Sequence, residues 1–168
     1  VTGKSYETLF TDFFIQQNKL AQTQLYTTYL QQEGRTIDYQ TDGEEDPYGK
    51  GDSLSSANLI SELGTGNVYM SVGDLYRFFG LYVNDKLLEK NLLNQLWERV
   101  SGSNYISGFY DKGNYYRAHG SKAGFESFAL FSKDNQSSVI LLTNRCSKTN
   151  VSLISNLYKE VTGVEATF

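Results

Sequence analysis

The chain opens with apolar residues at helical spacing. Steps of three and four positions separate Tyr6, Leu9, Phe10, Phe13 and Phe14. This stripe is typical of an amphipathic helix, which we expect over residues 4–17. The polar stretch that follows, residues 21–61, has no long period of either kind. We therefore expect only short strands in it, around residues 25–29 and 35–39.

Two helices are predicted in the middle of the chain. Ser71 and Asp74 have the spacing of an N-terminal capping box and precede an apolar stripe, which predicts a helix over residues 72–83 that ends at Asn84. The Gly-rich stretch before it, residues 64–67, reads as a turn. A second helix places on one face Leu88, Leu92, Leu93, Leu96 and Trp97.

From residue 104 the pattern becomes that of strands. The segments YISGFYD, YYRAHGS, ESFALFSK and SSVILLTN are short, rich in aromatic or β-branched residues, and separated by Gly, Asn and Asp. They predict successive antiparallel strands, with a hairpin connection at residues 133–136. The continuous apolar run at 139–142 predicts the most buried strand.

The chain closes with a further helical stripe, which Gly163 ends. Its members are Val151, Ile154, Leu157, Tyr158 and Val161. Helices, then an antiparallel sheet, then a terminal helix indicate an α+β fold. A length of 168 residues suits one domain, with a mainly helical and loop portion at 1–103 and the sheet with its helix at 104–168.

Charge and composition exclude several kinds of partner. The net charge is -4 and no Lys/Arg cluster is present, so a nucleic-acid partner is not expected. Cys146 is the single cysteine, which excludes an internal disulfide and a cysteine-based metal site. The acidic run at 42–46 lacks the ligand spacing of a calcium loop. We expect no metal and no cofactor.

Together these segments resemble the C-terminal part of the penicillin-recognising serine hydrolases, the family of class C β-lactamases, D,D-peptidases and related esterases. The stretch VTGKSYETLFTDFFI is similar to the helix after the family's Tyr-x-Asn motif. GTGNVYMSVGDLYRFFGLYVNDKLL resembles its Gly-rich turn and Ser-x-x-Asp helix, while HGSKAGFESFALF and SVILLTN resemble its last strands. The likeness covers nearly the whole chain and implies part of a β-lactamase-like domain.

Two motifs that the family uses for catalysis are missing. Ser-x-x-Lys supplies the nucleophile and a base, because a serine hydroxyl needs a neighbour to take its proton. No serine in this chain is followed three positions later by lysine. The matches to the second motif, residues 82–84 and 56–58, are interpreted as a helix end and an irregular stretch. The resemblance therefore implies that the nucleophile lies outside this chain.

The third family motif is Lys or His, then Thr or Ser, then Gly, on a strand that lines the site. Aligned without gaps on Gly124-Phe125, its three positions are Ala118, His119 and Gly120. A one-residue deletion would instead bring His119 to the cationic place and Ser121 to the glycine. The glycine lets substrate approach the strand closely, which disfavours that alternative.

The ungapped alignment implies roles for the residues around this motif. The N–H of Ser121 falls where the family has an oxyanion donor, and His119 falls where a side chain binds a substrate carboxylate. His119 could line the site, transfer a proton, or simply end the strand. Arg117 and Lys122 flank the strand end and could replace the missing positive charge, and strand alternation puts Arg117 on the same face as His119.

The resemblance implies a serine acyl hydrolase or transferase that acts on D-alanyl peptides, D-alanyl esters or related cell-wall acyl groups. The alternative is a non-catalytic module that uses the same fold to hold a cell-wall fragment. Either would be extracellular or at the cell surface, with a cell-wall-derived small molecule or polymer as partner. We also expect the N-terminal half of the domain to be a partner, or self-association in its absence, since an open sheet edge invites pairing.

Overall fold

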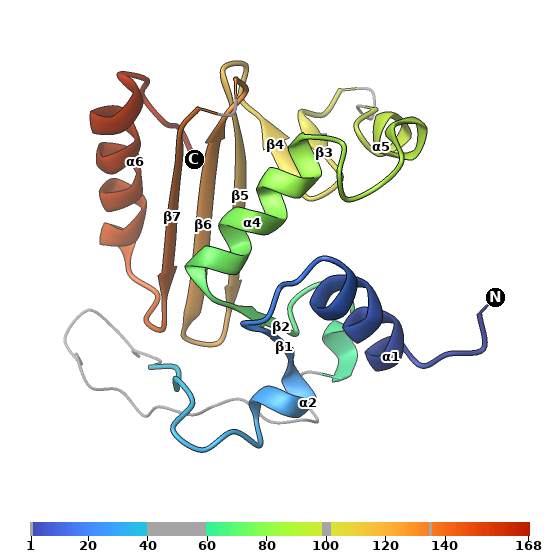
Figure 1. Ribbon diagram of the computed structural model, residues 1–168. Coiled ribbons are helices and arrows are strands. Elements are labelled where there is room, and N and C mark those ends of the chain that lie inside the picture. The colour runs from blue at the N-terminus through green and yellow to red at the C-terminus, as the bar shows by residue number, and fades with distance from the viewer. Residues whose placement is uncertain (1, 40–59, 99–101, 135) are drawn as a thin grey trace. The chain divides into compact units, whose positions relative to one another are not determined.

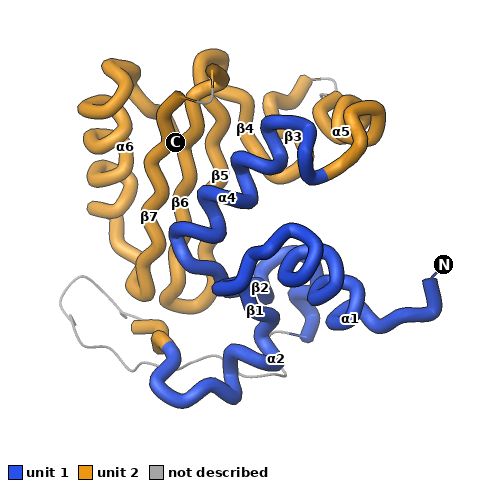
Figure 2. The backbone as a smooth tube through the Cα atoms, in the orientation of Figure 1, with its two compact units in different colours: residues 1–35, 55–87 blue, residues 36–54, 88–168 orange. Residues whose placement is uncertain are grey.

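The computed structural model describes residues 2–39, 60–98, 102–134 and 136–168 (Figure 1). The chain divides into two compact units, each coloured separately in Figure 2. Unit 1 comprises residues 1–35 and 55–87, and unit 2 comprises residues 36–54 and 88–168. The second helix predicted in the middle of the chain, which contains Leu88 to Trp97, therefore belongs to unit 2 together with the segments predicted as strands. The acidic run and the 56–58 match lie outside the described residues.

Unit 1 begins with the predicted helix, in two forms. An α-helix, α1 (Tyr6–Phe10), continues as a π-helix, η1 (Thr11–Gln17). Ser5 caps the N-terminus, because its hydroxyl oxygen accepts a hydrogen bond from the Thr8 N–H at 3.2 Å. Phe10 is the residue of α1 that becomes buried. The predicted helix is confirmed. Its second half is a π-helix, whose turns contain more residues than those of the α-helix that the apolar spacing predicted.

The strand predicted at 25–29 is wrong for most of its length. The strand β1 is Thr23–Leu25, and the next four residues form a short helix, α2 (Tyr26–Tyr29). β1 pairs antiparallel with β2 (Val68–Met70), a strand that the sequence interpretation missed after the Gly-rich turn. Because β2 offers only three residues, pairing stops at Leu25. The short 3-10 helix η2 (Ile60–Glu62) precedes that turn.

Helix α4 (Val72–Val83) has the bounds predicted from sequence. The Ser71 hydroxyl accepts from the Asp74 N–H at 3.1 Å, whereas the Asp74 carboxylate accepts from the Gln22 N–H at 2.7 Å and the Thr23 hydroxyl at 2.8 Å. Asp74 therefore ties β1 to the helix start. Asn84 donates to the Gly80 carbonyl at 2.7 Å, so the 82–84 match is a helix end, as interpreted.

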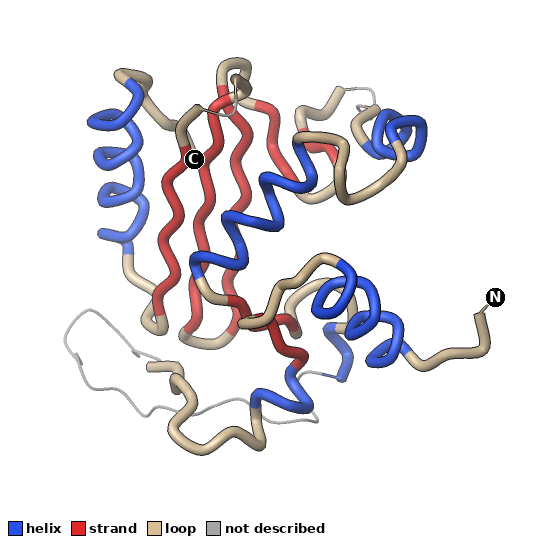
Figure 3. The backbone as a smooth tube through the Cα atoms, in the orientation of Figure 1, coloured by secondary structure: helices blue, strands red, loops and turns tan. Residues whose placement is uncertain are grey.

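Unit 2 contains a five-stranded antiparallel sheet (Figure 3). Its strands follow chain order and are β3 (Tyr105–Ile106), β4 (Phe109–Asp111), β5 (Tyr115–Lys122), β6 (Phe125–Ser132) and β7 (Ser138–Thr143). The segment YISGFYD is two strands instead of one, because Ser107 and Gly108 turn the chain with φ of 36° and 101°. Helix α5 (Lys90–Leu96) precedes the sheet.

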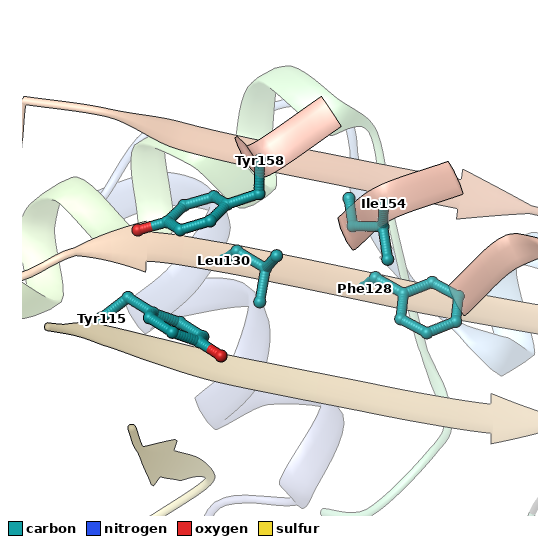
Figure 4. Packing of buried hydrophobic residues seen from close by; sticks show 5 residues of the cluster. All are labelled: Tyr115, Phe128, Leu130, Ile154 and Tyr158. Atoms are coloured by element: carbon teal, nitrogen blue, oxygen red, sulfur yellow. The ribbon is translucent and has the colours of Figure 1, made fainter. Parts of the chain in front are cut away.

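The terminal helix α6 (Lys148–Thr162) packs on one face of this sheet, as predicted. Five buried side chains form the contact: Tyr115, Phe128, Leu130, Ile154 and Tyr158 (Figure 4). Two of them, Ile154 and Tyr158, come from α6 and three come from β5 and β6, so part of the predicted stripe meets the sheet, whereas its members Leu157 and Val161 are exposed. Gly163 ends the helix in the left-handed conformation with φ of 73°.

The prediction that residues 139–142 form the most buried strand is wrong. β7 is half-buried along its whole length, whereas four consecutive residues of β6, 128–131, are buried. β6 lies between two strands, while β7 pairs only with β6 within the described part of the chain. Position in the sheet, rather than the apolar run itself, decides burial here.

Candidate functional site

Strand β5 carries all the site residues predicted from sequence, on two faces. Tyr115 packs against Tyr158 of α6, with ring centroids 5.1 Å apart. Because side chains alternate along a strand, Arg117, His119 and Ser121 share this α6 face. The side chains of Ala118 and Lys122, and the open side of Gly120, belong to the opposite face. The three motif positions are therefore split between the two faces.

His119 lies over the aromatic core of the α6 face. Its ring stacks on Phe128, the residue directly opposite on β6, at 4.3 Å between centroids and 9° between planes. The ring of Phe168 meets His119 edge-on at 6.2 Å. His119 Nε2 lies 3.0 Å from Glu126 Oε1, within hydrogen-bond distance. The imidazole is thus paired with a carboxylate.

Arg117 also sits in an aromatic setting on this face. Its guanidinium lies 4.5 Å from the Tyr110 ring centroid and 5.0 Å from that of Phe168, both cation–π distances. Nη1 donates to the Thr167 carbonyl at 3.4 Å. The positive charge of Arg117 is therefore held on the face opposite Ala118. Its use in place of the missing cation stays a prediction, as does that of Lys122.

The backbone of Ser121 points away from the neighbouring strand. In an antiparallel pair, residues alternate between bonding the partner strand and facing away from it. The Lys133 N–H donates to the Asn114 carbonyl at 3.1 Å, which fixes Asn114 as a residue that bonds β6. Counting along β5 in steps of two, Gly120 bonds β6 and Ser121 faces outward. Its N–H is directed at the outer edge of the strand.

That outer edge is open beside the motif. β4 pairs with only two residues of β5, Tyr116 and Arg117. From Ala118 to Lys122, no strand of the described part of the chain pairs with the outer side of β5. Residues 119–121 are accordingly exposed. An exposed N–H at a strand edge can donate to an anionic oxygen without breaking a bond of the sheet.

Gly124 is required by a close backbone approach at the tip of the β5–β6 hairpin. A Cβ placed there would lie 2.6 Å from the Tyr39 carbonyl oxygen and 2.7 Å from its nitrogen. The Gly124 N–H donates to the fully buried Asp38 carboxylate at 3.3 Å. Residues before Gly124 are thus positioned by a segment from far earlier in the chain, which sequence reasoning did not identify.

That segment was predicted as a strand at 35–39, which is wrong. Only an isolated parallel bridge between Tyr39 and Arg145 forms. The Tyr39 N–H donates to the Asn144 carbonyl at 2.8 Å, and the Asn144 side chain donates to the Ile37 carbonyl at 2.8 Å. These hydrogen bonds join residues 37 and 39 to Asn144, which lies in the loop after β7. The backbone of the segment therefore bonds a loop residue instead of pairing with a strand.

Neither a metal centre nor a membrane helix is present among the described residues. No group of three or more His, Cys, Asp or Glu side chains converges there. Within the same part of the chain, no helix combines the length and apolar character that crossing a bilayer requires.

Comparison with known proteins places this arrangement in a family. The Beta-lactamase family matches residues 1–156, most of the chain. The chain belongs to this family. A curated relative is PbpX of Bacillus subtilis (strain 168), described as a candidate penicillin-binding protein, which is 27% identical over 158 residues. That match covers 93% of this chain and 39% of PbpX.

Solved structures share the fold. FmtA from Staphylococcus aureus matches with a TM-score of 0.75 and 21% identity, over 95% of this chain and 43% of FmtA. A D-stereospecific amidohydrolase from Streptomyces sp. matches with a TM-score of 0.61 and 20% identity, over 97% of this chain and 50% of its own. The α+β arrangement predicted from sequence is confirmed. The chain spans half or less of the length of these relatives.

Proposed function

We propose that the open edge of β5 is one wall of an acyl-transfer site, in a serine acyl hydrolase or transferase of which residues 1–168 form the C-terminal part. The single observation that carries the proposal is the outward N–H of Ser121. It stands on a strand edge with which no described strand pairs, at the position that the family resemblance assigns to an oxyanion donor. Family membership supports acyl hydrolysis as the reaction class.

The chemistry divides between this chain and a second stretch of polypeptide. A serine hydroxyl from a Ser-x-x-Lys helix outside residues 1–168 attacks the acyl carbon, and the lysine takes its proton. The carbonyl oxygen becomes an oxyanion, to which the Ser121 N–H donates. One preorganised backbone donor of this kind lowers the barrier by about 3 to 4 kcal/mol. The Ser121 side chain has no part in that bond.

Ala118 directs the proposal toward a D-alanyl ester as substrate. A penicillin or a peptide C-terminus presents a carboxylate, to which the cationic first place of the family's third motif adds a charge-assisted bond. Alanine cannot form that charge-assisted bond. A D-alanyl ester presents an ammonium instead and loses nothing at this place. We therefore propose D-alanyl esters, rather than β-lactams, as the better acyl donors.

The test compares acylation rates of the full-length protein with penicillin and with a D-alanyl ester, followed by intact-mass measurement. We expect faster acylation by the ester. The matched variant Ala118→Lys restores the cation and should shift the preference toward penicillin by about tenfold or more, the worth of one charge-assisted hydrogen bond. Faster acylation of the unaltered protein by penicillin would refute the substrate assignment.

The non-catalytic module remains the second candidate, and a specific observation favours it. The family's cationic place is occupied by Ala118, while the nearest positive group on the strand, Arg117, is engaged with Tyr110 and Phe168 on the other face. A module of this kind would bind a cell-wall fragment and never form an adduct. Binding measured by calorimetry, together with an unchanged mass after incubation with the ester, would decide for it.

We also propose an extracellular or cell-surface location, since cell-wall acyl groups lie outside the membrane. The partner for the rest of the site is the first half of the domain. In support, β7 pairs on one side only within the described residues, and α6 exposes apolar side chains at helical spacing, namely Leu153, Leu157 and Val161. Sedimentation of the 168-residue chain should show self-association, and a cooperative monomer would contradict this.

A further inference from the structure

Among the described strands, only β6 pairs with the end of β5 that bears Ser121. β4 stops pairing at Arg117, so the last five residues of the strand depend on β6 and on side-chain contacts for their position. A catalytic donor must be held to within about 0.5 Å of its productive place. Something beyond the ladder should therefore fix this end of the strand.

Glu126 provides such a contact. It stands directly opposite Ser121 on β6, and its side chain is 10% exposed. One carboxylate oxygen, Oε1, lies 3.0 Å from His119 Nε2, two residues before Ser121 on the same strand. The other, Oε2, accepts a hydrogen bond from the Asn150 side chain of α6 at 2.7 Å. The carboxylate thus joins β5 to the first turn of α6 across β6.

The two ends of this network are themselves fixed. Asn150 also donates to the Arg145 carbonyl at 3.0 Å, which anchors it to the loop between β7 and α6. The His119 ring is stacked on the fully buried Phe128. The imidazole therefore has little rotational freedom. A displacement of Glu126 then moves the β5 backbone at His119, because rotation of the imidazole cannot compensate for it.

From this geometry we infer that Glu126 is a positioning residue for the Ser121 N–H, acting through His119 and braced by Asn150. The inference rests on the proposed function, because the proposed oxyanion role is what requires the Ser121 N–H to be held in one direction. His119 then serves the site through its bond to Glu126, from the face behind the strand. Glu126 itself touches no substrate.

The experiment uses the full-length protein with three variants. Glu126→Ala removes both bonds of the network, whereas Glu126→Gln keeps the shape and can still bond His119 and Asn150. Glu160→Ala is the matched control, since Glu160 is an exposed glutamate on α6 outside this network. Two readouts are taken below the melting temperature of every variant: kinetics on a D-alanyl ester, and the 15N order parameters of Gly120 and Ser121.

We expect Glu126→Ala to lower kcat by about 10- to 100-fold with KM changed by less than about twofold, because a donor displaced by about 1 Å loses transition-state contact more than substrate binding. The order parameters of Gly120 and Ser121 should fall from about 0.85 toward 0.6. Glu126→Gln should recover both readouts to within about threefold in kcat, and Glu160→Ala should leave them unchanged.

The two readouts separate the two claims. Unchanged order parameters in Glu126→Ala would overturn the positioning role, whatever the kinetics. Lowered order parameters that Glu126→Gln restores, in a protein that never turns over a D-alanyl ester, would support the positioning role and refute the proposed function. An equal loss of kcat in Glu160→Ala would show a general effect of altering the protein and would also overturn the inference.

Discussion

The two halves of strand β5 have opposite surroundings. Residues 115–117 pair with β6, and two of them, Tyr116 and Arg117, also pair with β4, while Tyr115 is buried against α6. Of the strands that the structure describes, only β6 pairs with residues 118–122, and three of these residues are exposed. The first half therefore contributes to the stability of the sheet, and the second presents backbone donors to solvent. One strand can have both functions because β4 stops pairing with it where the motif begins.

The largest expected effect comes from the closed half. Tyr115→Ala removes a ring that is 3% exposed, together with the hydrogen bond that its hydroxyl accepts from the Thr167 N–H at 2.7 Å. We expect the free energy of unfolding to fall by about 3 to 5 kcal/mol. Ser121→Ala, the matched truncation in the open half, should change it by less than about 0.5 kcal/mol. If urea denaturation showed similar losses of unfolding free energy in the two variants, the comparison would be refuted.

The tip of the hairpin should be the sensitive point of the open half. Gly124→Ala puts a methyl group 2.6 Å from the Tyr39 carbonyl oxygen, so the 36–39 segment or the hairpin must move. We expect a loss of about 1 to 3 kcal/mol in thermal unfolding. Gly80→Ala, inside α4 with no atom near the added methyl, is the control and should stabilise by up to about 1 kcal/mol. A gain in both variants would contradict the close approach.

A smaller effect should come from helix α6, which packs against Tyr115 in the first half of the strand. The Ser147 hydroxyl caps α6 by accepting a hydrogen bond from the Thr149 N–H at 3.3 Å. Ser147→Ala should cost about 1 kcal/mol in the free energy of unfolding. Ser152→Ala, an exposed change within the same helix, should cost nothing. Equal effects in calorimetry would show that the cap contributes no stability.

The smallest effect concerns the pH dependence of the α6 contact. Burial raises the pKa of the Tyr158 phenol above its usual value near 10. The folded state then binds this proton more tightly than the unfolded state, so the stabilisation is complete below about pH 10 and is lost as pH rises through the raised pKa. Tyr158→Phe cannot ionise, and its unfolding free energy should fall less than that of the unaltered protein between about pH 9 and 11. Parallel slopes in denaturant titrations would contradict this.

The sequence was informative wherever local patterns decide the structure. The α6 stripe and its Gly163 ending follow from spacing and backbone conformation alone, and so does α4, whose start and end are marked by Ser71 and Asn84. The alternation of residues on β5 also correctly grouped Arg117 with His119. Each of these features depends on residues that are close to one another in the sequence.

Features that depend on distant segments were missed. The approach of Tyr39 to Gly124 joins residues 85 positions apart, and no local pattern encodes it. The apolar run of β7 gave the wrong strand as the most buried, because burial depends on which strands lie on either side. The network of Glu126 and Asn150 behind His119 was equally invisible, since it needs the register of β5 on β6 and the packing of α6.

The central claim is that the open edge of β5 supplies an oxyanion donor to a nucleophile outside residues 1–168. It is tested most directly by identifying the acylated residue. The 168-residue chain and the full-length protein are each incubated with a D-alanyl ester, and intact mass is followed by peptide mapping. We expect no adduct on the 168-residue chain, in which no serine is followed three positions later by lysine. The full-length protein should carry one adduct, on a serine outside residues 1–168, whereas an adduct on any serine within them would contradict the account.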